Sequence, residues 1–210
     1  MNRIEWKKNL TEALIETRGG SRLPMIFFYG KDCEGSKKML GEVLTDEKAA
    51  IAIERETAPM MVDVEADREL ARRFKVDWTP TFVICDDEGN ALERIEGYLP
   101  VEDFIPQLLL SKGLADFHLG RHEDAIKEFE LIVDEHPASE LVPEAEYYLG
   151  ASTFKVTGET DKLAEVCHEL VMTHPDSAWT KRCSIWGRTK NELRQFIGYD
   201  GGGSAGSGAY

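Results

Sequence analysis

Apolar runs and amphipathic stretches alternate along the first half of the chain. Apolar residues recur on one helical face over about residues 4–18, which predicts an amphipathic helix, and three strand-like runs follow. These runs span residues 25–29, 60–64 and 82–85. Their length and their aromatic and β-branched content are typical of buried strands. A turn cluster at 86–90 leads into a return strand at 91–95, which predicts a hairpin. Residues 1–112 are therefore predicted to form an α/β domain.

The second half of the chain shows only helical periodicity. Pro100 opens a helix that is expected to continue without a linker through residue 112 into the next helix. Two apolar stripes, around Phe129 and around Cys167, are related by a shift of 38 residues, since Gly120 matches Gly158. The same shift relates His136-Pro137 to His174-Pro175 and Ser139 to Ser177. This repeat resembles tetratricopeptide repeats (TPR). It predicts a TPR-like all-α domain with a capping helix over residues 113–197, followed by a flexible Gly/Ser tail over 198–210.

The charge balance narrows the range of partners. The chain has 39 acidic and 25 basic residues, a net charge of -14, which disfavours binding to nucleic acid or to an anionic membrane surface. No apolar run approaches the roughly 20 residues needed for membrane insertion. The N-terminus does not resemble a signal peptide, and the four cysteines show no paired spacing. A cytoplasmic location with all four cysteines as thiols is expected.

The most reactive candidate residue is Cys33, which lies where the strand at 25–29 gives way to a helix beginning near Ser36. The exposed N–H groups and positive dipole at a helix N-terminus favour a thiolate. The neighbouring Asp32 is expected to raise the pKa of the thiol, and Lys31 is expected to offset part of that effect. Cys85, Cys167 and Cys183 fall within apolar patterns and are interpreted as core residues.

Two motifs together resemble the thioredoxin family: the turn at Cys33, and Trp78-Thr79-Pro80-Thr81 just before a strand. The resemblance implies a central mixed sheet flanked by helices and a cis bond at Pro80. It also implies that Cys33 and Ser36 form the catalytic position, if the protein is redox-active. Trp78, Thr79 and Pro80 would then form the wall that binds an extended peptide. The chain departs from the family in two places. Ser36 replaces the second, resolving cysteine, and Phe27 replaces the buried carboxylate.

Two functions follow from this resemblance, and both remain open. The first is an adaptor or accessory subunit of a larger cytoplasmic complex, which binds protein partners through the repeats and the thioredoxin-like surface without a dithiol reductase cycle. The alternative is a monothiol (CxxS) thiol-disulfide oxidoreductase that uses Cys33 to form mixed disulfides. Neither function requires a cofactor. The scattered His and Asp residues lack the spacing of metal ligands, so no metal site is predicted.

Overall fold

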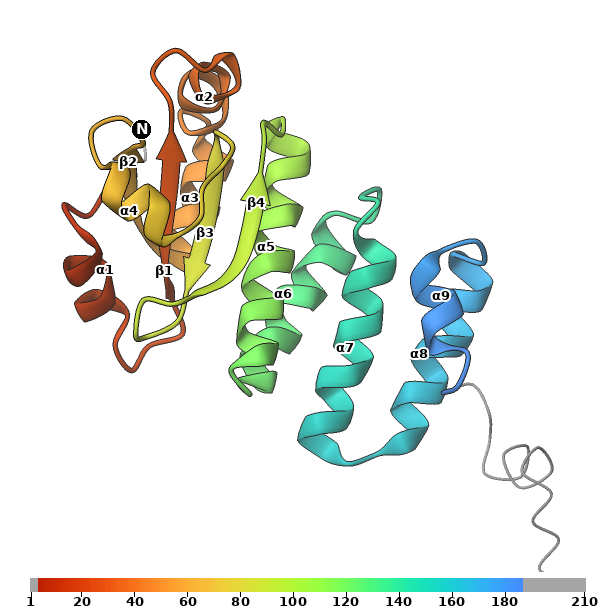
Figure 1. Cartoon of the computed structure of the whole chain (residues 1–210). Helices are drawn as coiled ribbons and strands as arrows, with labels where there is room; N and C mark the ends of the chain where they lie inside the picture. The colour runs from red at the N-terminus through yellow and green to blue at the C-terminus, as the bar shows by residue number, and fades with distance from the viewer. Residues whose placement is uncertain (1–3, 187–210) are drawn as a thin grey trace, which may run out of the picture.

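Four strands form one mixed sheet in the order β2–β1–β3–β4 (Figure 1). The computed structural model describes residues 4–186. The central strand β1 (Leu23–Tyr29) runs parallel to β2 (Thr57–Asp63) and antiparallel to β3 (Thr81–Cys85). The outer strand β4 (Ala91–Glu96) completes the predicted hairpin with β3. Because β1 is covered on both faces, its sequence is a continuous apolar run instead of an alternating one.

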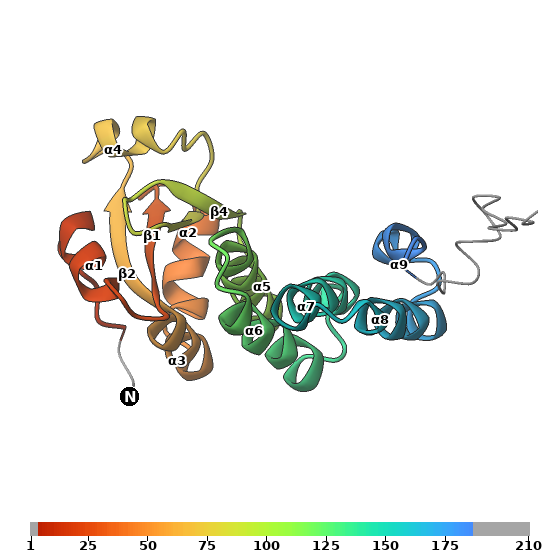
Figure 2. The ribbon, with the colours of Figure 1, turned by 90° about the horizontal axis from the view of Figure 1, so that it is seen from below.

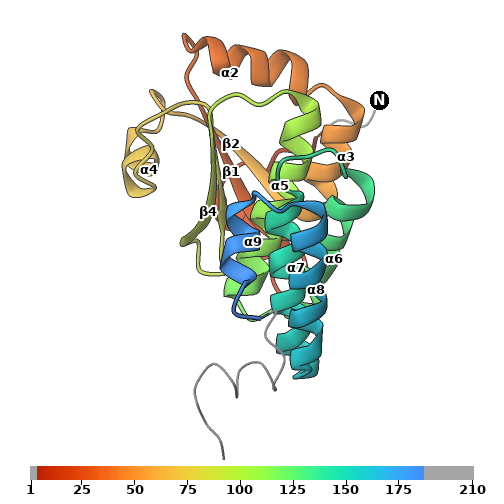
Figure 3. The ribbon, with the colours of Figure 1, turned by 90° about the vertical axis from the view of Figure 1, so that its right-hand side faces the viewer.

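Helices cover both faces of this sheet. They are α1 (Leu10–Thr17), α3 (Glu47–Glu56), α4 (Arg68–Arg73) and α5 (Val101–His118). Figure 3 shows α4 on one side and α3 and α5 on the other. Successive residues of β1 point to opposite faces of the sheet. Phe27 stacks on Phe82 on the face covered by α3 and α5, whereas Phe28 packs against Phe74 on the face covered by α4. The predicted α/β architecture is confirmed.

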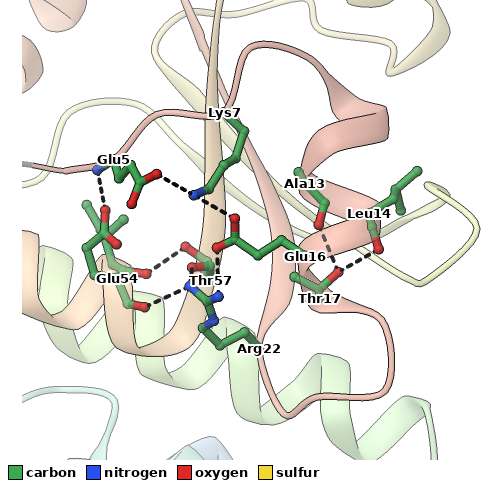
Figure 4. Close-up of polar contacts among 10 residues, drawn as sticks. Glu5, Lys7, Ala13, Leu14, Glu16, Thr17, Arg22, Glu54 and Thr57 are labelled. Atoms are coloured by element: carbon green, nitrogen blue, oxygen red, sulfur yellow. Dashed lines mark hydrogen bonds and ion pairs between the residues drawn. The ribbon is translucent and has the colours of Figure 1, made fainter.

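The N-terminal segment differs from the prediction of a helix over residues 4–18. The helix α1 begins only at Leu10, and Lys7 instead forms a parallel bridge beside β2, its N–H donating to the carbonyl of Pro59 at 2.8 Å. The Lys7 side chain is 7% exposed and forms an ion pair with Glu16 at 2.6 Å. Glu16 also forms an ion pair with Arg22 at 2.7 Å (Figure 4). Pairing with the sheet edge therefore outweighs helical periodicity in this segment.

The helix α5 packs against one face of the sheet and is also the first helix of the row formed by α5 to α9. It runs unbroken from Val101 to His118, as predicted. The later helices are α6 (His122–Glu135), α7 (Val142–Thr157), α8 (Thr160–Thr173) and α9 (Ala178–Cys183). They extend away from the sheet in a row (Figure 2). The boundary expected between residues 112 and 113 lies inside α5. Residues 187–197 of the expected repeat region and the whole 198–210 tail lie outside the described residues.

The sequence repeat has a structural counterpart. Helices α6 and α8 have the same length, and their first and last residues are separated by 38 positions. Each follows a glycine with positive φ, Gly120 at +76° and Gly158 at +73°, which suits a residue without a side chain. Close helix contacts also recur: a Cβ on Gly113 would lie 2.6 Å from the Phe129 ring, and a Cβ on Gly150 would lie 3.0 Å from Val166.

A buried charged cluster joins α3, α5 and α6. Lys112 of α5 is 1% exposed and forms an ion pair with Asp116, which is 0% exposed. The Lys112 Nζ atom also lies 4.0 Å from Glu128 of α6, whose carboxyl group is a neighbour of Glu56 at the end of α3. Burial, followed by the nearby charge of Glu56, raises the pKa of Glu128 to about 8. The Glu128 carboxyl group is therefore expected to keep its proton at neutral pH.

The stability of the protein is expected to depend on the protonation of Glu128. Its folded pKa lies above its unfolded value, so stabilisation is fully present below about pH 4.5 and is lost as the pH rises towards 8. Glu128→Gln should flatten this dependence, which amounts to about 4 kcal/mol over that window. Urea unfolding at several pH values measures it. The exposed Glu130 on the same helix provides the control, Glu130→Gln. An unchanged slope in Glu128→Gln would contradict the assignment.

Candidate functional site

Cys33 lies at the N-cap of a short helix, α2 (Glu34–Lys38), which continues into a π-helical turn, η1 (Met39–Val43). The strand β1 ends at Tyr29, and a turn closed by the Cys33 N–H and the Gly30 carbonyl at 3.1 Å leads to the cysteine. The strand-to-helix position predicted for this residue is therefore correct. Cys33 is partly exposed to solvent, unlike the other three cysteines, which are buried.

The Cys33 sulfur is surrounded by hydrogen-bonding groups. Its thiol donates to the backbone carbonyl of Thr79 at 3.0 Å. The side chains of Ser36 and Thr79 and the backbone N–H groups of Ser36 and Gly35 also hydrogen-bond to it. Ser36 is 0% exposed, and its hydroxyl oxygen accepts the Gly30 N–H at 3.2 Å, which leaves its O–H for the sulfur. The Ser36 hydroxyl is therefore held in a position from which its O–H can donate to the Cys33 sulfur.

The pKa of Cys33 differs from the expectation that Asp32 would raise it. Burial raises the pKa, but the hydrogen bonds from Ser36 and Thr79 outweigh burial, and the net shift is downwards. Asp32 is exposed to solvent, where its charge is screened. Lys31, expected to act on the thiol, is instead held by Asp63 at 2.7 Å. Hydrogen bonding within the turn, and not the neighbouring charges, therefore sets the state of this thiol.

The second predicted motif lies against the first. The Thr79–Pro80 peptide bond is cis, and the Thr79 carbonyl reaches the Cys33 sulfur. Trp78 is 67% exposed at the start of this loop, and its carbonyl accepts the Thr81 hydroxyl at 2.8 Å. The fold thus brings Cys33, Ser36, Thr79 and Pro80 together, with Trp78 presented to solvent beside them.

Gly35 is a site residue that the sequence reasoning missed. A Cβ at this position would lie 3.0 Å from the Cδ atom of Pro80 and 3.8 Å from the Cys33 sulfur. A side chain would push the Pro80 loop away from the cysteine. The sequence could have indicated this role, because Gly35 lies between Cys33 and Ser36 in the motif.

The remaining cysteines lie in the interior. Cys85 is 0% exposed at the end of β3, and burial raises its pKa to about 12. The pairing of β3 with β1 places Cys85 at the end of the sheet opposite Cys33, because Ile84 pairs with Met25 near the start of β1. Cys167 and Cys183 are buried in the row of helices. Cys85 is therefore placed too far away to act as a resolving thiol for Cys33.

A group of aromatic side chains marks a second candidate surface, between α7 and α9. Tyr147 stacks on Trp186 with ring centroids 4.3 Å apart and also contacts Trp179 at 5.1 Å. The guanidinium group of Arg182 lies 4.1 Å from the centre of the Trp179 ring. These half-exposed rings present large contact area, which is common in protein interfaces.

Residues 4–186 contain neither a metal-binding cluster nor a membrane-spanning helix. Within this range no three His, Cys, Asp or Glu side chains gather in a way that could hold a metal ion. No helix in the same range combines the length and apolar character needed to cross a membrane.

Residues 10–111 match a family model described as a thioredoxin-like domain. Similar solved structures include a thioredoxin from Thermus thermophilus, 28% identical over 51% of this chain and 85% of that one, with a TM-score of 0.44. The oxidised C-terminal domain of DsbD from Neisseria meningitidis is 17% identical over 47% of this chain and 88% of that one, at 0.41. Mitochondrial thioredoxin 3 from Saccharomyces cerevisiae is 26% identical over 45% and 83%, at 0.35. No curated protein matches the chain.

Proposed function

Since residues 10–111 form a thioredoxin-like domain, we propose that this protein is a monothiol thiol-disulfide oxidoreductase that forms mixed disulfides through Cys33. The observation that carries the proposal is the placement of Cys33: it is partly exposed at the N-cap of α2, and its sulfur lies 3.0 Å from the Thr79 carbonyl beside the cis Thr79–Pro80 bond. Although burial raises the pKa of Cys33, hydrogen bonds from Ser36 and Thr79 lower it overall. The thiolate is the nucleophile in disulfide exchange, so a lowered pKa favours attack at neutral pH.

The proposed reaction proceeds in two exchanges. The Cys33 thiolate attacks one sulfur of a substrate disulfide, a bond forms between these two sulfurs, and the other substrate sulfur leaves as a thiolate. Ser36 has no thiol with which to release the mixed disulfide. An external thiol, either a small thiol such as glutathione or a partner cysteine, attacks the mixed disulfide and regenerates the Cys33 thiolate. The side chains of Trp78, Thr79 and Pro80 would line the path of the bound peptide.

The pH dependence of alkylation tests this proposal. Cys33 is expected to react as a thiol with a pKa below the ordinary cysteine value, and Cys33→Ser should lose both this reaction and mixed-disulfide formation. Ser36→Ala removes one donor, so it should raise the pKa of Cys33 and slow alkylation at pH 7 by roughly threefold. The exposed Ser21 provides the control, Ser21→Ala. A thiol that titrates at or above the ordinary value would contradict the proposal.

The second candidate function is a non-catalytic adaptor within a larger complex. One observation favours it: a hollow of about 320 Å³ crosses from α3 of the thioredoxin-like domain to the end of α6. Ile51, Ile105 and Leu109 form its apolar part, with Arg55 and His136 at its edges. We propose that the helices α5 to α9 are TPR-like repeats and that residues 113–197 form a partner-binding unit. A cytoplasmic location is part of both proposals.

Recovery of partners by Cys33→Ser separates the two functions. An adaptor would recover the same partners as the native protein, under both reducing and non-reducing conditions. A monothiol enzyme would lose the partners that are held through a disulfide. Ile51→Glu should weaken recovery only if the hollow between α3 and α6 is used. This substitution is suitable because Ile51 is 43% exposed, so the change should leave the core intact.

A further inference from the structure

Two buried cysteines lie side by side at the far end of the helix row. Cys167 on α8 is 2% exposed, and Cys183 at the end of α9 is 0% exposed. The Cys167 thiol donates to the backbone carbonyl of Cys183 at 3.0 Å, and the Cys183 sulfur lies 4.0 Å from the carbonyl of Cys167. Each sulfur is therefore in contact with the other cysteine.

The surroundings of this pair do not explain it as a metal site. The neighbouring side chains are apolar: Leu170 is buried beside the sulfurs, and Val166, Tyr147 and Trp186 pack against them. Two thiols alone fall short of the four ligands of a structural zinc site, and the described residues place no third ligand beside them. Two buried thiols, each in contact with the backbone carbonyl of the other cysteine, are instead close enough in the fold to be considered as a disulfide pair.

We propose that Cys167 and Cys183 form an oxidation site that closes into a disulfide and fixes α9 to α8. The oxidant is a small or protein disulfide. One cysteine loses its proton and attacks a sulfur of the oxidant, whose other sulfur leaves as a thiolate. The second cysteine then loses its proton and attacks the first, and the remaining sulfur of the oxidant leaves. Two thiols are oxidised by two electrons, one disulfide is reduced to two thiolates, and these take up the two protons.

Opening of α9 controls access to this site. Burial, with the adjacent Cys167 thiol, raises the pKa of Cys183 to about 12, so the Cys183 thiol is a poor nucleophile while α9 is docked. The helix α9 has only six residues and depends on packing against α7 and α8. A helix this short opens locally more readily than the core of the domain. The pair is therefore expected to oxidise more slowly than the partly exposed Cys33, at a rate set by α9 opening.

Closure of the disulfide would also hold the aromatic surface in place. Trp179 and Arg182 are carried by α9, whereas Tyr147 belongs to α7. A bond between Cys167 and Cys183 keeps these groups together and removes the opened forms of α9. It also constrains the unfolded chain, which is the usual origin of disulfide stabilisation. The reduced and oxidised proteins then differ in how firmly this surface is presented.

The test uses the full chain carrying Cys33→Ser, incubated with excess glutathione disulfide. Free thiols are then alkylated under unfolding conditions, and the protein is digested with trypsin. Cleavage after Lys162, Lys181 and Arg182 puts Cys167 and Cys183 on separate peptides. We expect these two peptides to be linked, the intact mass to fall by about 2 Da, and the thermal midpoint to rise by about 5–10 °C. Reduction with dithiothreitol should reverse all three changes.

The control adds Cys183→Ala, which should abolish the link and the rise in thermal midpoint. If this variant does not fold, the reversal by dithiothreitol supplies the same comparison within one protein. Recovery of Cys167 and Cys183 as alkylated thiols would overturn the proposal. Separate glutathione adducts on the two cysteines, or a lower thermal midpoint after oxidation, would also overturn it.

Discussion

Lys112→Met is expected to lower the free energy of unfolding by about 3–5 kcal/mol at pH 7. Lys112 and Asp116 are almost completely buried and form an ion pair. Without the lysine, Asp116 retains only the Arg121 guanidinium at 4.0 Å as a cationic neighbour. The pKa of Asp116 is already raised by burial, with Lys112 opposing that effect. Loss of the cation therefore leaves an uncompensated charge or forces uptake of a proton. Urea unfolding at pH 7 measures the cost.

Two comparisons make the Lys112 prediction specific. Lys127→Met removes an exposed lysine that pairs with Asp124 on α6, and should cost no more than about 1 kcal/mol. The double variant Lys112→Met/Asp116→Leu replaces the pair with apolar side chains and should regain most of the loss. A single variant as stable as the native protein would show that this pair has no stabilising role at neutral pH.

Gly113→Ala is expected to destabilise the protein by roughly 2 kcal/mol, although alanine is the better helix former. The added Cβ would lie 2.6 Å from the Cε1 atom of Phe129 and 2.9 Å from its Cζ atom. The Phe129 side chain is 0% exposed, so its ring cannot move aside freely. Helices α5 and α6 would have to separate at the start of the helix row. The midpoint of urea unfolding reports the effect.

A control substitution and a compensating substitution test whether the clash between a Cβ at position 113 and the Phe129 ring causes the loss of stability. Gly41 lies in the exposed η1 segment, and a Cβ added there would meet no heavy atom within 4 Å, so Gly41→Ala should be neutral or slightly stabilising. Adding Phe129→Leu to Gly113→Ala should cost less than the sum of the two single changes, because the smaller side chain relieves the clash. Additive losses would exclude direct contact between positions 113 and 129 as the cause.

Much of the thioredoxin-like domain could be predicted because its central strands β1 and β3 are apolar runs and a turn cluster precedes β4. The run at 25–29 lies inside β1, and the helix opened by Pro100 continues through residue 112 as expected. The start of α1 could not be predicted, since residues 4–9 have a helical apolar pattern. Their extended form depends on a hydrogen bond to Pro59, which is distant in the sequence. Lys112 shows the same limit: its burial depends on carboxylates of two helices, Asp116 of α5 and Glu128 of α6.

The candidate site was predictable as a set of residues but not in its electrostatics. The motifs around Cys33 and Pro80 identified the two loops that the fold brings together. Charges adjacent in sequence suggested a raised pKa for Cys33. In the folded protein Asp32 faces solvent and Lys31 binds Asp63, so the hydrogen-bond donors of the turn decide the outcome. Those donors are positioned by backbone geometry, which local sequence does not reveal.

The unbroken helix α5 determines how the protein can be divided into fragments. A fragment ending at residue 112 would stop in the middle of α5 and leave Glu56 without its neighbours from α6. A fragment ending at Gly120 would keep the whole helix but expose the side of α5 that faces Phe129. Expression of the thioredoxin-like domain or of the later helices alone therefore removes a surface that the other part packs against. The two parts are expected to fold best as one chain.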